Sequence, residues 1–169
     1  CKVMISLLDY GAGNVRSLRN AIGRLGFELT DIERPEDILK AERLVFPGVG
    51  SFGAVMQRLH VLGYVEPLRE YLEAGRPFFG ICIGLQCLFE GSEESPGVEG
   101  LGLIPGVIRR FEAGTLSVPH MGWNGVRLER ESPLFDGYGG EKFYFVHSYH
   151  AVPEPANASW LLGRSDYGG

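Results

Sequence analysis

Residues 78–89 read Phe-Phe-Gly-Ile-Cys-Ile-Gly-Leu-Gln-Cys-Leu-Phe, and this stretch decides the predicted fold. Its first four residues predict a strand, and Ile83–Phe89 predicts a helix. The chain must therefore turn sharply at Cys82, which has Gly80 two residues before it and Gly84 two residues after it. Small residues are needed at both positions, because larger side chains would collide where the backbone doubles back. The pattern predicts a tight turn that holds the cysteine in a strained conformation between a strand and a helix.

Strands and helices also alternate in the residues before this stretch. The predicted strands are Val3–Leu8, Glu28–Ile32 and Arg43–Phe46, and the predicted helices are Val15–Leu25, Pro35–Lys40, Ala54–Leu62 and Glu66–Ala74. Such alternation favours a parallel sheet that is covered by helices on both faces.

The residues after Gly91 show a different pattern, with short strands and turns. The candidate strands are Leu103-Ile104, Val107–Phe111, Val126–Leu128, Phe143–Val146, Ala151-Val152 and Ser159–Leu162. They predict an antiparallel or mixed extension of the parallel sheet. Because no internal repeat or linker divides the chain, we expect a single α/β domain over residues 1–169.

The composition is that of an ordinary soluble protein, with 44% hydrophobic and 22% charged residues. It excludes collagen, disordered tails, coiled coils and disulfide scaffolds. The net charge of −5 argues against a surface for nucleic acid or anionic membranes. The three cysteines lack metal-type spacing, so we expect no metal site and a reducing compartment. No leader pattern or membrane-length apolar stretch is found, which predicts a protein of the cytoplasm or an organelle matrix.

Cys82 is the first candidate for chemistry. In the predicted turn its sulfur lies at the start of a helix, where backbone N–H groups and the helix dipole favour the thiolate. The alternative is a buried cysteine that packs between two glycines, because cysteine is often a core residue. That alternative describes Cys87 better, since Cys87 lies inside the predicted helix without flanking glycines.

The second candidate is the loop Gly48–Gly53, which follows a predicted strand and matches the dinucleotide pattern G-x-G-x-x-G. Two facts weaken the interpretation as a nucleotide site. The loop follows the third strand and not the first, and the acidic residues about 20 positions on fall in a helical pattern rather than at the end of a strand. The competing interpretation is an anion cradle, in which the N–H groups of Gly48, Val49 and Gly50 point at an oxyanion beside the cysteine turn. We favour the cradle, because a cysteine that transfers acyl groups needs an oxyanion hole.

A cysteine nucleophile also needs a base, usually a histidine that is oriented by an acid. His60 lies in a predicted helix and is interpreted as a solvated surface residue. His120 and His147 lie among aromatic and polar residues, which is typical of a site or an interface, whereas His150 has no obvious partner. No spacing pairs any of the four with Cys82.

Together these motifs resemble the class I, triad-type glutamine amidotransferases, and more narrowly the glutaminase subunits of imidazole glycerol phosphate synthase. The resemblance rests on Gly80–Gln86 and on residues 9–14, 47–50, 91–94, 119–124 and 144–149. It implies a flavodoxin-like fold and hydrolysis of L-glutamine to glutamate and ammonia without a cofactor. It also implies a (β/α)8-barrel cyclase partner, which receives the ammonia and makes imidazole glycerol phosphate and AICAR in histidine biosynthesis.

The resemblance also implies roles for particular residues. Cys82 matches the nucleophile that forms a glutamyl thioester, and Gly48–Gly50 matches the oxyanion strand. Gln86 and Glu94 match positions that hold the amino-acid end of the substrate. A loop of His147, Ser148 and Tyr149 would close over that end. The partner interface would include Asn14, Pro119, His120, Met121, Gly122, Trp123 and Asn124.

One feature departs from the family, whose base and acid lie in a His-Pro-Glu sequence near the C-terminus. None of the four histidines here is followed by Pro-Glu. We therefore assign neither base nor acid, and we expect a domain that lacks the C-terminal segment of the family. Three hypotheses stay open: an active glutaminase subunit, a non-catalytic module that binds glutamine and its partner, and a flavodoxin-like nucleotide binder built on Gly48–Gly53.

Overall fold

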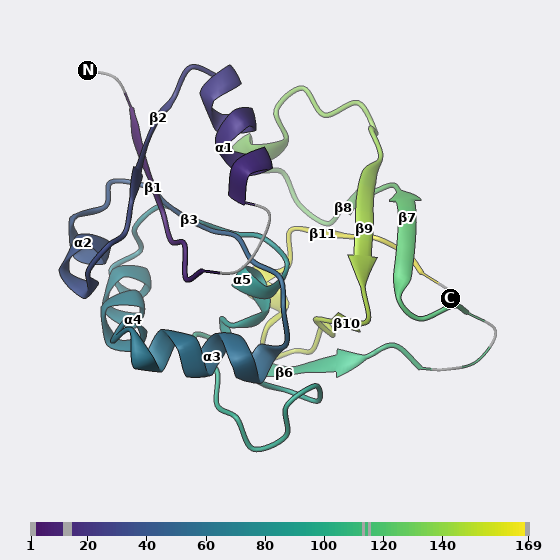
Figure 1. Ribbon diagram of the computed structural model, residues 1–169. Helices are drawn as coiled ribbons and strands as arrows, with labels where there is room; N and C mark the ends of the chain where they lie inside the picture. Colours follow the sequence, from purple (N-terminus) through teal and green to yellow (C-terminus); the bar gives the residue numbers. More distant parts are fainter. Residues whose placement is uncertain (1–2, 12–14, 113, 115, 168–169) are drawn as a thin grey trace.

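The computed structural model describes residues 3–11, 15–112, 114 and 116–167 of the chain (Figure 1). The first half contains β1 (Met4–Leu7), α1 (Val15–Arg24), β2 (Glu28–Asp31), α2 (Pro35–Lys40), β3 (Leu44–Phe46), α3 (Phe52–Val61), α4 (Val65–Glu73), β4 (Phe78–Gly80) and α5 (Ile83–Gln86). The second half contains β5 (Phe89–Ser92), β6 (Ile104–Arg110), β7 (His120–Asn124), β8 (Arg127–Leu128), η1 (Pro133–Phe135), β9 (Phe143–His147), β10 (Tyr149–His150), η2 (Ala158–Trp160) and β11 (Gly163–Arg164).

Four strands of the first half form a parallel sheet in the order β2-β1-β3-β4. In its register, Leu7 pairs with Asp31 on one side and with Val45 on the other. Strand β2 is added on one side of β1. The chain then crosses back, and β3 and β4 are added on the other side of β1. Because such crossovers are right-handed, α1 covers one face while α2, α3 and α4 cover the opposite face, as Figure 1 shows. The predicted parallel sheet with helices on both faces is confirmed.

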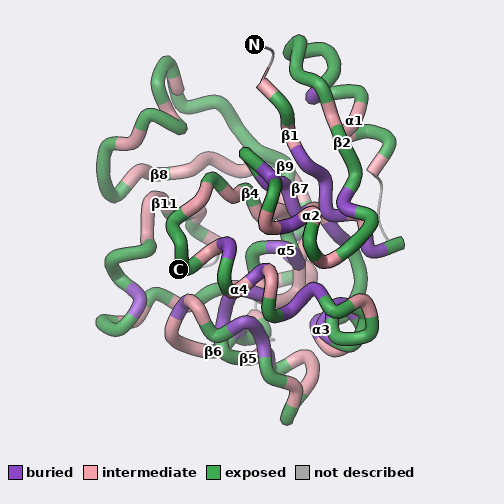
Figure 2. The backbone as a smooth tube through the Cα atoms, turned by 90° about the vertical axis from the view of Figure 1, so that its left-hand side faces the viewer, coloured by how far each residue is buried: buried purple, intermediate pink, exposed green. Residues whose placement is uncertain are grey.

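The main core lies between this sheet and its helices. All three residues of β3 are buried, because β3 has a strand on each side and helices on both faces. Helix α3 buries Phe52, Val55, Met56 and Leu59, whose spacing of three and four residues puts them on one face. Figure 2 shows the buried backbone concentrated in the first half, close to the sheet and α3.

The second half forms smaller sheets, namely β10-β6-β5, β11-β8 and the antiparallel pair β7-β9. Three predictions for residues from Ile83 onward are wrong. The helix predicted over Ile83–Phe89 ends at Gln86, because Phe89–Ser92 pairs with β6 instead. Ser159–Leu162 was predicted as a strand but begins in the 3-10 helix η2, and Ala151-Val152 is irregular. Strand β7 was not predicted, because its glycine and polar residues interrupt an apolar pattern.

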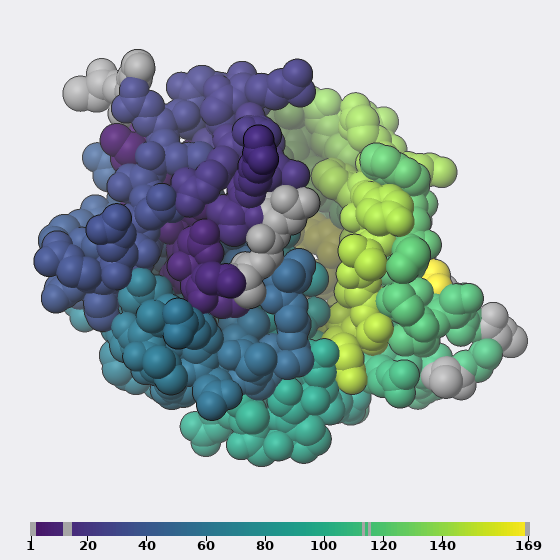
Figure 3. Space-filling model, in the orientation of Figure 1, coloured from purple at the N-terminus to yellow at the C-terminus, as the bar shows by residue number. Residues whose placement is uncertain are grey.

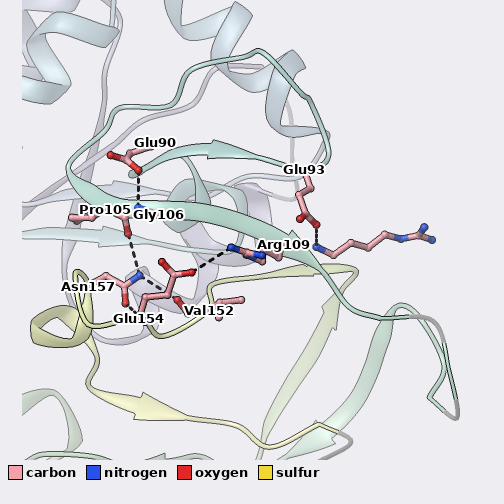
Figure 4. Close-up of polar contacts among 9 residues, drawn as sticks. Glu90, Glu93, Pro105, Gly106, Arg109, Val152, Glu154 and Asn157 are labelled. Carbon is pink, nitrogen blue, oxygen red and sulfur yellow. Dashed lines mark hydrogen bonds and ion pairs between the residues drawn. The ribbon is translucent and has the colours of Figure 1, made fainter.

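A buried amide links the C-terminal residues to β6 (Figure 4). Asn157 donates hydrogen bonds to the carbonyls of Pro105 (3.0 Å) and Val152 (3.2 Å), and it accepts one from the N–H of Glu154 (2.9 Å). The Glu154 carboxylate in turn lies 3.4 Å from Arg109 on β6. These contacts hold the segment after β10 against the sheet without an apolar core of its own.

Among the helices of the described ranges, none has the length and apolar character that crossing a membrane requires.

Candidate active site

The cysteine turn has the geometry that its glycines predict. Cys82 has φ 55° and ψ −112°, and it is the one residue other than glycine with a positive φ in the described ranges. A Cβ at Gly80 would lie 2.8 Å from backbone atoms of Gly84 and Leu85, and a Cβ at Gly84 would overlap the carbonyl oxygen of Phe46. Only glycine therefore fits at either position. A strained backbone that presents a cysteine between a strand and a helix is typical of a nucleophile.

The predicted preference for the thiolate at Cys82 is not supported. Partial burial of the sulfur raises the pKa of the Cys82 thiol above its usual value, and the Glu94 carboxylate raises it further. The N–H of Ile83 hydrogen-bonds the sulfur and lowers the pKa, but it does not reverse the shift. Helix α5 has only four residues, so it contributes little dipole. The residue is nevertheless exposed to reagents, whereas Cys87 is fully buried and its pKa is raised to about 12.

The glycine loop lies against this turn. A Cβ at Gly48 would overlap the hydroxyl of Tyr10 and would lie 2.7 Å from Cγ2 of Ile83, the residue after Cys82. Val49 is 57% exposed, and Gly50 has φ +122°, a value that favours glycine. The structure thus brings the predicted oxyanion strand next to the predicted nucleophile.

The far end of the loop makes contacts that argue against a nucleotide site. The N–H of Phe52, at the start of α3, donates to Oε2 of Glu94 (2.8 Å), and the N–H of Gly53 donates to the hydroxyl of Ser95 (2.9 Å). In a dinucleotide site these N–H groups would face a pyrophosphate. Here a carboxylate already occupies that place, and it would repel a phosphate.

The residues predicted to hold the amino-acid end of a substrate meet across a loop. Gln86 on α5 donates from Nε2 to the carbonyl of Tyr149 (3.3 Å), 63 positions later. Nδ1 of His147 lies 2.8 Å from the same carbonyl oxygen. Ser148 accepts a hydrogen bond from the N–H of Phe111 through its carbonyl (3.0 Å). The predicted loop is therefore fixed to α5 and to the end of β6, while Glu94 is held at the start of α3 and is near enough to Cys82 to raise its pKa.

Three histidines form an aromatic cluster that lines a cavity of about 550 Å³. Nδ1 of His120 lies 3.2 Å from Nε2 of His147, and His150 stacks on Phe111 with ring centres 4.1 Å apart. Burial lowers the pKa of both His120 and His150, and the neighbouring His147 lowers both further. Among the described residues, none of the three has a carboxylate hydrogen-bond partner. The cluster thus supplies no histidine and acid pair, while His60 is exposed on α3 as predicted.

Strands β7 and β9 form a two-stranded ribbon with two different faces. Met121 and Trp123 are 61% and 68% exposed, and their cross-strand partners Val146 and Tyr144 are also exposed. His120 is only 4% exposed and therefore does not lie on this exposed face, although it was predicted for the partner surface. The reason is the two-residue repeat of a strand, which turns residues 120, 122 and 124 away from residues 121 and 123.

The other predicted interface residues lie near the ribbon. Pro119 precedes β7 and is half-buried, as is Gly122 within it. Asn124 donates from its amide to the carbonyl of Asp166 (2.7 Å). Asn14 lies outside the described residues. In the space-filling view the ribbon is a raised area of green and yellow-green atoms, separated by a hollow from the purple N-terminal part (Figure 3).

Two residues of the site were not predicted as such. Tyr10 donates to the carbonyl of Val49 (3.1 Å), and Ser95 accepts from Gly53. Tyr10 follows the carboxyl end of β1, where open α/β sheets place their ligand sites, and that position was the available signal. Ser95 lies in a turn and had no comparable signal.

Comparisons with known proteins give a consistent result. Residues 6–168 match the family model described as Glutamine amidotransferase class-I. The chain is 44% identical over 172 residues to the imidazole glycerol phosphate synthase subunit HisH of Syntrophotalea carbinolica, with 98% of this chain and 82% of that protein covered. It is 50% identical over 166 residues to a protein of Arabidopsis thaliana named imidazole glycerol phosphate synthase hisHF, chloroplastic, covering 98% of this chain but only 28% of that protein.

A solved structure shows the same fold at lower identity. The structure of PurLQS from Thermotoga maritima superposes with a TM-score of 0.68 at 20% identity, covering 99% of this chain and 76% of that one. At this identity the likeness concerns the fold alone.

Proposed function

This chain belongs to the class I glutamine amidotransferases and, within them, to the HisH family, and we propose that it is the glutaminase part of an imidazole glycerol phosphate synthase. In that reaction the Cys82 sulfur attacks the side-chain carbonyl carbon of glutamine. The negative charge that develops on the carbonyl oxygen is held by N–H groups of the Gly48–Gly50 loop. The amide nitrogen takes up the proton that the thiol has lost and leaves as ammonia, and water then hydrolyses the glutamyl thioester to glutamate and the free thiol.

The charges around Cys82 support a proposal for how the two ends of the substrate are held. An amino acid carries one ammonium and one carboxylate, which need an acceptor and donors respectively. Glu94 uses one carboxylate oxygen for the N–H of Phe52, and its second oxygen remains to accept from the ammonium group. For the carboxylate end, the proposed donors are the amide of Gln86 and the loop 147–149, which is joined to Gln86 through the Tyr149 carbonyl. Because burial raises the pKa of Cys82, the thiol proton must be taken up by a base during the attack.

The observation that carries this proposal is the strained turn at Cys82 between two glycines that no other residue can replace. The test is ammonia release from glutamine by the full protein assembled with its cyclase. Cys82→Ala is expected to abolish release, whereas the matched variant Cys87→Ala keeps it, because Cys87 is buried away from solvent. Undiminished release by Cys82→Ala would refute the proposal.

For the partner, we propose a cyclase subunit that receives the ammonia and makes imidazole glycerol phosphate and AICAR. The supporting observation is the exposed apolar face of the ribbon, formed by Met121, Trp123, Tyr144 and Val146. Large exposed aromatic residues of this kind are typical of the centre of protein interfaces. The name of the longer Arabidopsis relative, which covers both functions in one chain, is consistent with such a pair. We place the assembly in the cytoplasm or an organelle matrix, as a heterodimer or a fused protein.

A second candidate is a module that binds glutamine and the cyclase without turnover. It is favoured by the absence, among the described residues, of a histidine paired with a carboxylate beside Cys82. The two candidates differ in one assay. Glutamine binding by calorimetry without ammonia release would establish the binding module, whereas release that depends on Cys82 would exclude it.

A further inference from the structure

Tyr10 is the residue that joins the end of β1 to the glycine loop. It is 4% exposed, and its ring meets Phe46 of β3 edge-on, with centres 5.7 Å apart. Its hydroxyl donates to the carbonyl oxygen of Val49 at 3.1 Å. The hydroxyl also occupies the space that any side chain at position 48 would need. Tyr10 therefore lies beneath the loop and touches it at two successive residues.

This contact orients the loop because a peptide group is planar and trans. When the carbonyl of Val49 points down to Tyr10, the N–H of Gly50 in the same peptide group must point to the opposite side. That side is open, since Val49 and Gly50 are both exposed and so is Cys82. Without a donor below the loop, the carbonyl could turn toward the open side, where its partial negative charge would repel an oxyanion.

The hydroxyl remains a donor under all working conditions. Burial raises the pKa of Tyr10 to about 12, and the nearby thiols raise it as well. The ring is held on the other side by Phe46, so the hydroxyl has little freedom to leave Val49.

We propose that Tyr10 is a positioning residue for the oxyanion hole: it fixes the Val49 carbonyl on the buried side of the glycine loop and so directs the N–H of Gly50 to the open side, where the reacting carbonyl would lie at Cys82. This role rests on the proposed glutaminase function. It assigns Tyr10 no contact with the substrate.

The test compares Tyr10→Phe with the matched variant Tyr64→Phe in the full protein assembled with its cyclase. Both variants remove one buried hydroxyl that donates to a backbone carbonyl, since Tyr64 is 3% exposed and donates to Ile32 (3.3 Å). Glutamine turnover is measured together with alkylation of Cys82 by iodoacetamide. In alkylation the sulfur displaces iodide from carbon and the thiol proton goes to solvent, so no oxyanion forms.

We expect Tyr10→Phe to lower kcat about tenfold to a hundredfold, less than or similar to the loss of one oxyanion-hole donor. KM and the alkylation rate are expected to stay within about twofold of the wild-type values, because neither needs the oxyanion hole. Tyr64→Phe is expected to leave kcat unchanged.

Three outcomes would overturn the role of Tyr10: an unchanged kcat in Tyr10→Phe, equal losses of kcat in both variants, or a parallel loss of alkylation that shows a displaced Cys82. A wild-type protein that releases no ammonia would instead overturn the proposed function, and the role of Tyr10 with it. The wild-type assay thus separates the two failures.

Discussion

Residues 3–11 and 15–112 are stabilised in a different way from residues 116–167. The cluster of buried apolar residues extends from Leu8 to Ile108, and in the later described residues only His120 and Asn157 are buried. The first part excludes water from aliphatic and aromatic side chains, which is the main favourable term in folding. The second part relies on stacked rings and on hydrogen bonds such as those of Asn157.

This contrast explains how the site is built. The cysteine turn and the glycine loop pack on the apolar core through the buried Ile83 and Tyr10. The ribbon and the loop 147–149 are held by polar and aromatic contacts, and such regions open at lower free energy than a core. We therefore expect changes in the first part to act on global stability and changes in the second part to act locally.

The largest effect is expected at Gly84. A Cβ there would overlap the Phe46 carbonyl, and neither backbone can move without displacing β3 or α5. Gly84→Ala should lower the free energy of unfolding by more than about 4 kcal/mol, in the range of the most damaging substitutions. Urea denaturation measures it. Gly23→Ala is the control, because no atom lies within 4 Å of the added Cβ, and it should raise stability by about 0.5–1 kcal/mol.

A smaller and more local effect is expected at Asn157. Asn157→Ala removes the two hydrogen bonds that the side-chain amide donates to the carbonyls of Pro105 and Val152. It also removes the bond that the amide oxygen accepts from Glu154. Loss of such buried bonds should cost about 1–3 kcal/mol. The rate of amide hydrogen exchange should rise first in residues 149–164, while β1 and β3 stay protected. The control is Asn20→Ala at an exposed position, which should change neither the stability nor the exchange rates. Equal loss of protection in β3 would mean that the two parts unfold as one unit.

Acidification should act on the second part through its histidines. Because the pKa values of His120 and His150 are lowered in the folded state, the unfolded chain binds protons at a pH where the folded chain does not. Stability is therefore fully present above about pH 6.5 and falls as the pH drops below it. We therefore expect the melting temperature to be lower at pH 5 than at pH 7.5.

The control for this pH effect uses single variants. His120→Asn should reduce the difference in melting temperature between the two pH values, whereas a change at the exposed His60 should leave it intact. If the wild type, His120→Asn and the His60 variant all show the same difference in melting temperature, carboxylates elsewhere in the protein cause the pH effect.

The smallest effect on stability is expected at Trp123. Its side chain is 68% exposed, so Trp123→Ala should change the free energy of unfolding by less than about 0.5 kcal/mol. Affinity for the cyclase should nevertheless fall at least about tenfold, as for an aromatic anchor of an interface. Trp160→Ala, at a 55% exposed position on η2, serves as the control in a titration of the two subunits. If Trp123→Ala and Trp160→Ala bind the cyclase with equal affinity, the ribbon is not part of the interface.

The parts that were predicted correctly are those with strong local patterns. Strands β1 and β3 are largely apolar runs that are followed by turn residues. Gly80 has a steric meaning that depends on the turn itself, because a Cβ there would meet Gly84 and Leu85. The second half was predicted less well. Its strands have two to seven residues, and the pairing of β7 with β9 joins residues more than 18 positions apart.

By itself the sequence determined the α/β order of the first half, the tight turn at Cys82 and the glycine loop, because each depends on residues close together in the chain. Tertiary structure alone decided that His120 points inward while Trp123 points outward, that Glu94 covers the start of α3, and that Tyr10 lies under Val49. Tertiary structure also raised the pKa of Cys82, whereas its place at the start of a helix had predicted a preference for the thiolate. The physical reason is the same in each case: burial, strand register and charge proximity are properties of residues that meet only after the chain has folded.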